Sequence, residues 1–265
     1  VADLPAELLS PPQADSDADL TKQLRQRGSL TLSGSTLTLG ASGEGRTVTL
    51  ACRTLRLTNG ARIITNGNNL VIEALNTHFA DNAGISSFSP QTIKAATASN
   101  GASGGKIRIH VLEGFSGSLR VSLPGQNGGD GVTGASGSAG PQGNRGANAV
   151  KGLVDCRSGG QDGGTGGQGG KGATGGAGGS GGDGGDLILQ GVAAGNRALI
   201  DFDAPGGKGG LAGSGGAGGP GGPGGEGGSG DGPCGGGHGG ANGLAGAQGD
   251  KGAAGANGKP GKQTP

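Results

Sequence analysis

Large side chains are scarce in this chain. Its 265 residues include no Trp, Tyr or Met and only four Phe. A conventional core of bulky side chains is therefore not available to most of the sequence. The longest apolar runs fall far short of the roughly 20 residues that a membrane span needs, so no span is expected. The net charge of +1 gives no basic excess that would favour a nucleic-acid partner.

Methionine is missing even at the start, because the chain begins at Val1. We expect that a signal peptide has been removed and that the protein is secreted, extracellular or at the cell surface. Three cysteines are present, Cys52, Cys156 and Cys234. This number fits an oxidising compartment, with one disulfide and one thiol left over.

Glycine is the abundant residue, with 71 copies against an ordinary usage of about 7%. In four runs it recurs at every third position, and in the second and third runs a neighbouring column of glycines, interrupted by Ala173 and Ala212 respectively, adds a second repeat. This strict period favours an ordered structure over a flexible linker. The four glycine runs are Gly128–Gly146, Gly160–Gly184, Gly206–Gly230 and Gly237–Gly261.

A left-handed extended helix has three residues per turn and rises about 3.1 Å per residue. One glycine column then leaves one bare stripe of backbone, along which neighbouring helices can approach and exchange N–H···O=C bonds. Such bonds can replace a hydrophobic core, because each buried backbone group must find a partner. The second and third runs carry two columns each, so we expect them inside the bundle and the first and fourth runs outside.

The Gly-Gly-X pattern resembles the polyglycine-II bundles of snow-flea antifreeze protein and of some phage tail-tip adhesins, over roughly residues 125–262. A collagen triple helix also needs glycine at every third position. However, the runs here are only about 25 residues long, contain few prolines, and are interrupted by strand-like segments. The resemblance implies a bundle architecture and carries no binding motif.

Before the glycine runs, residues 29–74 alternate apolar and polar side chains, as in Leu30 and Leu32 or Leu70 and Ile72. Asn59-Gly60 and Asn66-Gly67 are turn dipeptides. This pattern predicts short strands with one buried face, arranged as a β-solenoid or small sandwich. The stretch LTNGARIITNGNNLVIEA loosely resembles bacterial β-helical surface proteins. We therefore expect an all-β fold combined with polyglycine-II helices.

An internal repeat links the two kinds of sequence. Residues 104–125 and 184–206 each contain two apolar strands and end in Pro-Gly. We predict that both repeats extend the same β-core. The expected organisation is an N-terminal extension at 1–28 that docks within or between subunits, a β-rich core at 29–124 with a short arm at 76–103, a glycine-rich out-and-back pair at 125–186, a joining strand pair at 187–205, and a second out-and-back pair at 206–265.

The reversals of the two out-and-back pairs fall at Ala147–Ser158 and Asp231–Gly235. Cys156 and Cys234 lie one in each, so we predict that they form a disulfide at the ends of the runs, provided that their Cα atoms lie within about 7 Å. Cys52 would then be a buried free thiol. The charged residues of these turns, Lys151, Asp155, Arg157 and Asp231, are the expected contact-loop residues.

The segment Gly181–Leu189 fits the calcium-binding nonapeptide G-G-x-G-x-D-x-U-x, with Asp183 and Asp186 as the ligands. Such sites need tandem copies, and only one copy is present, so no cofactor is expected, with calcium as the alternative. The glycine motifs do not open a helix after a strand, which excludes a nucleotide loop. No catalytic set is visible in the sequence, so we expect that the protein is not an enzyme.

Three functions are consistent with these features. The leading hypothesis is a structural subunit of a secreted extracellular fibre or surface appendage, which self-assembles with copies of itself through the β-core and the N-terminal extension. The second is a receptor-binding adhesin tip, in which the two turns contact a cell-surface or matrix ligand. The third is ice binding, which the mixture of charged and small residues between the glycines argues against.

Overall fold

The computed structural model describes residues 4–40, 45–80 and 82–265. The described chain is mostly β-structure with few helices, and its two large sheets consist of parallel strands. It divides into two compact units. Unit 1 contains residues 1–129, 179–210 and 255–265, and unit 2 contains residues 130–178 and 211–254.

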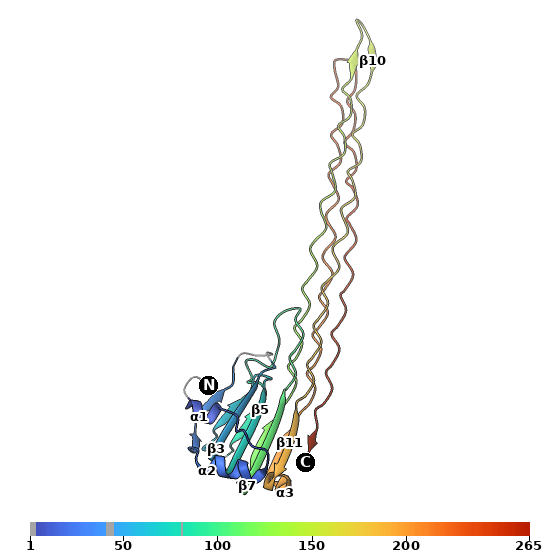
Figure 1. The fold of residues 1–265 in the computed structure, drawn as a ribbon. Coiled ribbons are helices and arrows are strands. Elements are labelled where there is room, and N and C mark those ends of the chain that lie inside the picture. The colour runs from blue at the N-terminus through green and yellow to red at the C-terminus, as the bar shows by residue number, and fades with distance from the viewer. Residues whose placement is uncertain (1–3, 41–44, 81) are drawn as a thin grey trace. The chain divides into compact units, whose positions relative to one another are not determined.

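Two parallel sheets form the body of unit 1 (Figure 1). From β1 to β8 the chain alternates between the two sheets, so that odd-numbered strands are neighbours in one sheet and even-numbered strands in the other. The first sheet has the order β1 (Leu30–Ser33), β3 (Thr47–Thr58), β5 (Asn69–Phe79), β7 (Lys106–Gly117), β11 (Asp186–Gly191) and β13 (Gln263–Thr264); the second has the order β12 (Ile200–Asp203), β8 (Leu119–Ser122), β6 (Gly84–Ser86), β4 (Arg62–Ile64) and β2 (Thr36–Thr38).

The aliphatic side chains that alternate along these strands form one buried cluster. Leu55, Ile63, Ile72 and Val121 are among its fully buried members. The turns between strands follow the predicted chemistry. Asn59 and Asn66 both have a positive φ, of 53° and 52°, and each precedes a glycine with positive φ. Asparagine tolerates this left-handed conformation better than most residues, which lets the chain reverse between successive strands.

Some strands are longer than the alternation predicts, because the outer face of the first sheet is also covered. In β3 the four consecutive residues 49–52 are buried, which breaks the two-residue period. The helix α2 (Asp17–Arg25) packs Leu20 and Leu24 against Ala51 and Leu75 on this face. The strand therefore continues without a break over 12 residues.

The N-terminal extension docks on its own chain in this structure. Helix α1 (Ala6–Leu9) places Leu8 in the main core, where it is 3% exposed. Helix α2 begins after Ser16, whose hydroxyl accepts a hydrogen bond from the Asp19 N–H. Such a cap satisfies one of the backbone donors that the first helical turn leaves unpaired.

The second copy of the internal repeat differs from the first between its two strands. A short helix α3 (Val192–Gly195) and a 3₁₀ turn (Arg197–Leu199) lie between β11 and β12, whereas a single residue separates β7 from β8. The predicted arm at 76–103 is also divided among other elements. Its first residues complete β5, residues 84–86 form β6, and the part that bonds to the glycine runs is the stretch 95–104.

Unit 2 contains parts of all four glycine runs, which lie side by side without helix or strand assignment (Figure 1). Backbone hydrogen bonds join the runs at every third residue. Gly131 donates to the Leu211 carbonyl at 2.8 Å and Gly134 to that of Ser214 at 2.9 Å, so the first and third runs are parallel. Gly164 donates to Asn144 and Gly167 to Pro141, so the first and second runs are antiparallel.

The number of neighbours differs between inner and outer runs, as the glycine columns predicted. The second run bonds to the other three, through pairs such as Gly164–Asn144, Gly163–His238 and Gly225–Gly164. The third run also bonds to all three others, whereas the first and fourth runs each bond to the second and third. The two runs that bond to three neighbours are therefore the two that carry two glycine columns.

Candidate functional site

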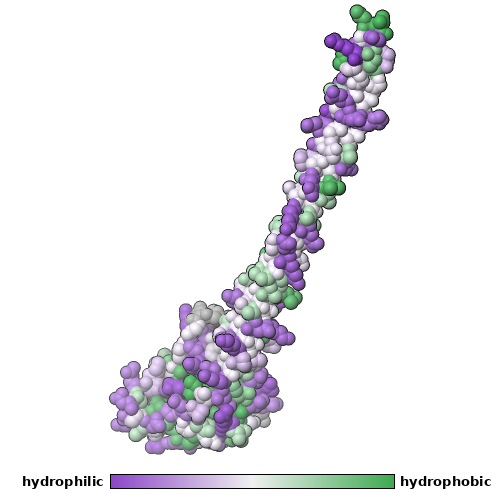
Figure 2. Space-filling model, turned by 90° about the vertical axis from the view of Figure 1, so that its right-hand side faces the viewer, coloured by the Kyte–Doolittle hydropathy of each residue, from purple (hydrophilic) through white to green (hydrophobic). Residues whose placement is uncertain are grey.

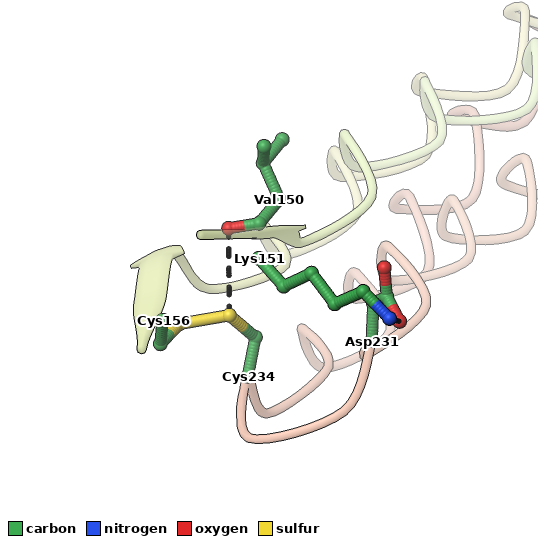
Figure 3. Close-up of a disulfide and its surroundings, with 5 residues drawn as sticks. All are labelled: Val150, Lys151, Cys156, Asp231 and Cys234. Carbon is green, nitrogen blue, oxygen red and sulfur yellow. Dashed lines mark hydrogen bonds and ion pairs between the residues drawn. A yellow bond between two sulfur atoms is a disulfide. The ribbon is translucent and has the colours of Figure 1, made fainter. Parts of the chain in front are cut away.

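The two turns at which the glycine runs reverse both lie in unit 2. In the first, β9 (Val150–Lys151) and β10 (Cys156–Ser158) form an antiparallel pair. In the second, Asp231 and Cys234 exchange backbone hydrogen bonds of 3.1 Å. We call residues 147–158 and 231–235 together the disulfide turn (Figure 3).

Cys156 and Cys234 form a disulfide with their Cα atoms 5.0 Å apart, which is the pairing that the sequence indicated. Cys234 is 4% exposed. Its Sγ lies 3.5 Å from the carbonyl oxygen of Val150 (Figure 3). The bond joins positions that are 78 residues apart in the sequence. It therefore ties the reversal of the first two runs to the reversal of the last two.

The third cysteine, Cys52, is a free thiol buried in unit 1. Burial raises the pKa of this thiol to about 11, against the lowering effects of a backbone hydrogen bond at Leu30 and of the Arg27 charge. The thiol is therefore protonated at neutral pH, and the reactive form of cysteine is the thiolate. Cys52 thus acts as a packing residue.

The predicted contact-loop residues divide into two groups. Lys151 Nζ lies 3.5 Å from Asp231 Oδ1, and this ion pair bridges the two halves of the disulfide turn (Figure 3). Asp155 closes the first half, because its carbonyl oxygen accepts the Gly152 N–H at 2.8 Å. The Asp155 carboxylate and the Arg157 guanidinium are exposed and make no ion pair with any residue that the structure describes.

Two aliphatic residues of the same turn were not among the predicted contacts. Leu153 and Val154 have relative exposures of 104% and 97%, and Val150 is 49% exposed. Figure 2 shows hydrophobic atoms gathered at the end of unit 2 that carries the disulfide turn. Isolated exposed aliphatic residues are common on protein surfaces, whereas these two are adjacent and both fully exposed. In the sequence, these residues could have been recognised as two adjacent aliphatic side chains in a turn made mostly of small and polar residues.

The adjoining runs fix the base of the disulfide turn through backbone bonds. Ala149 donates to the Ser229 carbonyl at 2.9 Å, and Gln161 donates to the Ala147 carbonyl at 2.8 Å. The side chain of Asn148 accepts the Ser229 N–H at 3.0 Å. Because both halves of the turn rest on bonded backbone, the exposed aliphatic pair is presented from a defined platform.

Asp162 and His238 lie close to this base. The Asp162 carboxylate accepts the His238 N–H at 2.6 Å, and its Oδ1 lies 3.4 Å from His238 Nδ1. The backbone hydrogen bond, aided by the imidazole, holds the pKa of the Asp162 carboxyl below its ordinary value. The carboxylate is thus maintained as an acceptor for the fourth run.

The proposed calcium ligands have a similar backbone role in unit 1. Asp183 Oδ1 accepts the Lys259 N–H at 2.7 Å, and Asp186 Oδ1 accepts the Lys262 N–H at 3.1 Å. Within the described parts of the chain, no group of three or more His, Cys, Asp or Glu side chains is placed to hold a metal ion. The two carboxylates therefore have a structural function that does not require calcium.

A separate polar hollow of about 270 Å³ lies in unit 1 between the N-terminal segment and the first sheet. Arg108 Nη2 pairs with Glu73 Oε1 at 3.1 Å, and His110 Nε2 lies 3.6 Å from Asp17 Oδ1. The second Glu73 oxygen is buried without a hydrogen-bond partner among the described residues. These contacts connect β5 and β7 with the start of α2, so they contribute to docking the N-terminal segment.

No helix in the described residues is long and apolar enough to cross a membrane. Comparison with known proteins found no matching family model, curated protein or solved structure.

Proposed function

We propose that this chain is a structural subunit of a secreted extracellular fibre or surface appendage, which self-assembles through its β-core. One observation carries the proposal: both ends of the two parallel sheets are unfinished. At one end β1 and β2, and at the other β12, have an outer edge without a strand partner among the described residues. Unpaired edges are templates for strand addition by another chain.

Partly buried core side chains mark both ends. Leu32 and Leu37 pack against the core from β1 and β2, and Phe202 does so from β12. A second copy stacked on either end would cover these side chains and continue the parallel ladder. The strand pairs would then act as coils of a β-solenoid, in which each pair contacts only its neighbours.

In this proposal the glycine runs are polyglycine-II helices that pack as a bundle. Backbone bonds at every third residue support the assignment, because such a helix has three residues per turn. The disulfide supports secretion, since disulfides persist in oxidising compartments. Leu8, Leu20 and Leu24 of the N-terminal extension are buried on their own chain, which favours assembly through strand edges over exchange of this segment.

A proline scan of the edge tests the stacking. The N–H of Leu39, which follows β2, bonds inward to the Ile64 carbonyl at 2.8 Å, so the Thr38 N–H points to the open side. Thr38→Pro removes an outward donor and keeps the inward bonds, whereas Thr38→Val keeps both. We expect filaments by electron microscopy for the wild type and Thr38→Val, and short particles for Thr38→Pro. A wild type that remains monomeric under all conditions contradicts the proposal.

The exposed Leu153–Val154 pair favours a second candidate, a receptor-binding adhesin tip. In that case the disulfide turn contacts a cell-surface or matrix ligand. Replacing Leu153 and Val154 by serine should abolish adhesion to cells and leave the melting temperature unchanged. Adhesion that survives this change removes the candidate.

A further inference from the structure

Unit 1 has an apolar groove of about 450 Å³ on the outer face of its second sheet. The groove runs over β4, β6 and β8 and is bordered by the segment that follows β6. Its floor and walls are mainly apolar, although the strands on this face otherwise carry polar residues. The apolar lining consists of Ile64, Pro90, Ile93 and Pro124 together with the nearly buried Phe88, whereas the side chain of Ile85 is buried in the core.

Two arginines line one side of the groove. Arg62 and Arg120 lie in register on either side of Gly84, on three adjacent strands. Arg62 Nη1 lies 3.0 Å from the position that a β-carbon on Gly84 would occupy, so the glycine leaves space for the guanidinium. Arg120 Nη1 lies 3.7 Å from Asp201 Oδ2, whereas the Arg62 guanidinium has no ion pair or hydrogen bond with any described residue.

The disulfide turn offers the complementary features. Leu153 and Val154 project into solvent, and Asp155 follows them with a carboxylate that pairs with no described residue. The turn presents an apolar pair next to the Asp155 carboxylate, with the Arg157 guanidinium two residues further along the chain, and the groove is apolar and lined by the Arg62 guanidinium, which pairs with no described residue. The Asp155 carboxylate and the Arg62 guanidinium are both exposed. A contact between them gives each a partner and leaves no unpaired charge buried in the interface.

We propose that Leu153, Val154 and Asp155 of one copy bind in the β4–β6–β8 groove of a second copy, with Asp155 placed against Arg62. Different surfaces of the two copies meet in this contact, which makes it heterologous and able to propagate without closing. The inference rests on the proposed fibre function and adds a specific contact between copies to it.

The contact is too small to hold two free copies together, except transiently at high protein concentration. Three side chains cover far less than the roughly 800 Å² per partner of a standard interface. It becomes effective when many copies are already aligned by core stacking, because each further contact is then effectively intramolecular. The expected role is therefore lateral association of fibres, while stacking of the β-core builds each fibre.

Charge reversal tests the contact while leaving the stacking edges unchanged. We expect Asp155→Arg and Arg62→Asp, each alone, to raise the concentration needed for lateral association at least tenfold. The double variant Asp155→Arg/Arg62→Asp should recover association. Leu153→Asp should behave like the single charge variants, and Leu244→Asp, at another exposed position of unit 2, should behave like the wild type. Fibre width by electron microscopy and sedimentation are the readouts.

Unchanged association in Asp155→Arg, or no recovery in the double variant, overturns the inference even when single fibres form normally. A zero-length carbodiimide cross-link gives an independent readout that needs no fibre. In the Arg62→Lys variant, at high concentration and with ¹⁴N- and ¹⁵N-labelled copies mixed, coupling should join Asp155 of one isotope to position 62 of the other. A wild type without fibres removes the proposed function, and this cross-link then decides the contact. Its absence, or its confinement to single chains, overturns the contact.

Discussion

The carboxylate of Asp183 accepts a hydrogen bond from the backbone N–H of Lys259 at 2.7 Å. Glycine columns supply the donors that join neighbouring runs, but residues between the glycines also have N–H groups, and some of these lack a backbone acceptor. Asparagine and aspartate on the adjacent parallel run supply the missing acceptors. The same arrangement recurs for Asn127 and Lys208, Asn148 and Ser229, Asp162 and His238, and Asp186 and Lys262.

Replacing Asp183 by alanine should lower the free energy of unfolding by about 1 kcal/mol, since a typical hydrogen bond contributes that amount. Asp183→Asn keeps an oxygen in the same place and should be close to neutral. Thermal unfolding followed by circular dichroism measures both. If Asp183 served mainly as a calcium ligand, added calcium would stabilise the wild type and not the asparagine variant; we expect no difference.

Opening the Cys156–Cys234 disulfide should destabilise unit 2 by about 2–5 kcal/mol, because the bond restricts a long loop in the unfolded chain. Cys156→Ser/Cys234→Ser should match the reduced wild type in denaturant unfolding. Hydrogen exchange should show the loss of protection beginning at Ala149 and Gln161, whose N–H groups bond across the base of the turn. Unchanged protection there would show that the backbone bonds hold the turn without the disulfide.

Two glycine-to-alanine changes should have opposite effects. A β-carbon on Gly219 would lie 1.9 Å from the Ser138 carbonyl oxygen, whereas on Gly239 its nearest neighbour is the Gly225 carbonyl oxygen at 3.8 Å. Gly219→Ala should cost about 3 kcal/mol or more through forced separation of the runs. Gly239→Ala should stabilise by about 0.4–1 kcal/mol by restricting the unfolded chain. Denaturant midpoints of the two variants make the comparison.

The buried thiol of Cys52 should make stability fall at high pH. Its pKa is about 11 in the folded state and about 8.5 in an unfolded chain. The stabilising difference is therefore complete below about pH 8.5 and is lost as pH rises through 11, to a maximum of about 3 kcal/mol. Cys52→Ala should show a flatter alkaline decline than the wild type. Equal slopes in the two proteins would contradict this assignment.

Sequence periodicity predicted the structure correctly where the same contact between neighbouring runs or strands repeats along the chain. The three-residue spacing of glycine identified the four runs, and Asn59 and Asn66 marked turns because their conformation is set locally. The break in a column at Ala173 has its cause in the neighbouring first run. Its N–H bonds to Ala135, a small residue, whereas a β-carbon on the equivalent Gly167 would meet the Pro141 ring at 2.5 Å.

Features that depend on distant partners could not be derived in the same way. The burial of Ala51 and Leu75 on the outer face requires α2 to lie there, and nothing in the strand pattern itself specifies this cover. The backbone role of Asp183 depends on which residue of the fourth run lies opposite. The groove beside Arg62 brings together residues from three strands, and its position follows from their parallel register.

The bonding of the runs also limits how this sequence can change in length. Inserting one residue in any run would move all later positions of that run out of the three-residue spacing of the backbone bonds and place side chains where Gly134 or Gly219 now meets bare backbone. A triplet inserted into one run alone would shift its partners out of alignment. A triplet inserted into all four runs would preserve every contact. The bundle is thus modular, and evolution or design can extend it only in concerted steps of three residues per run.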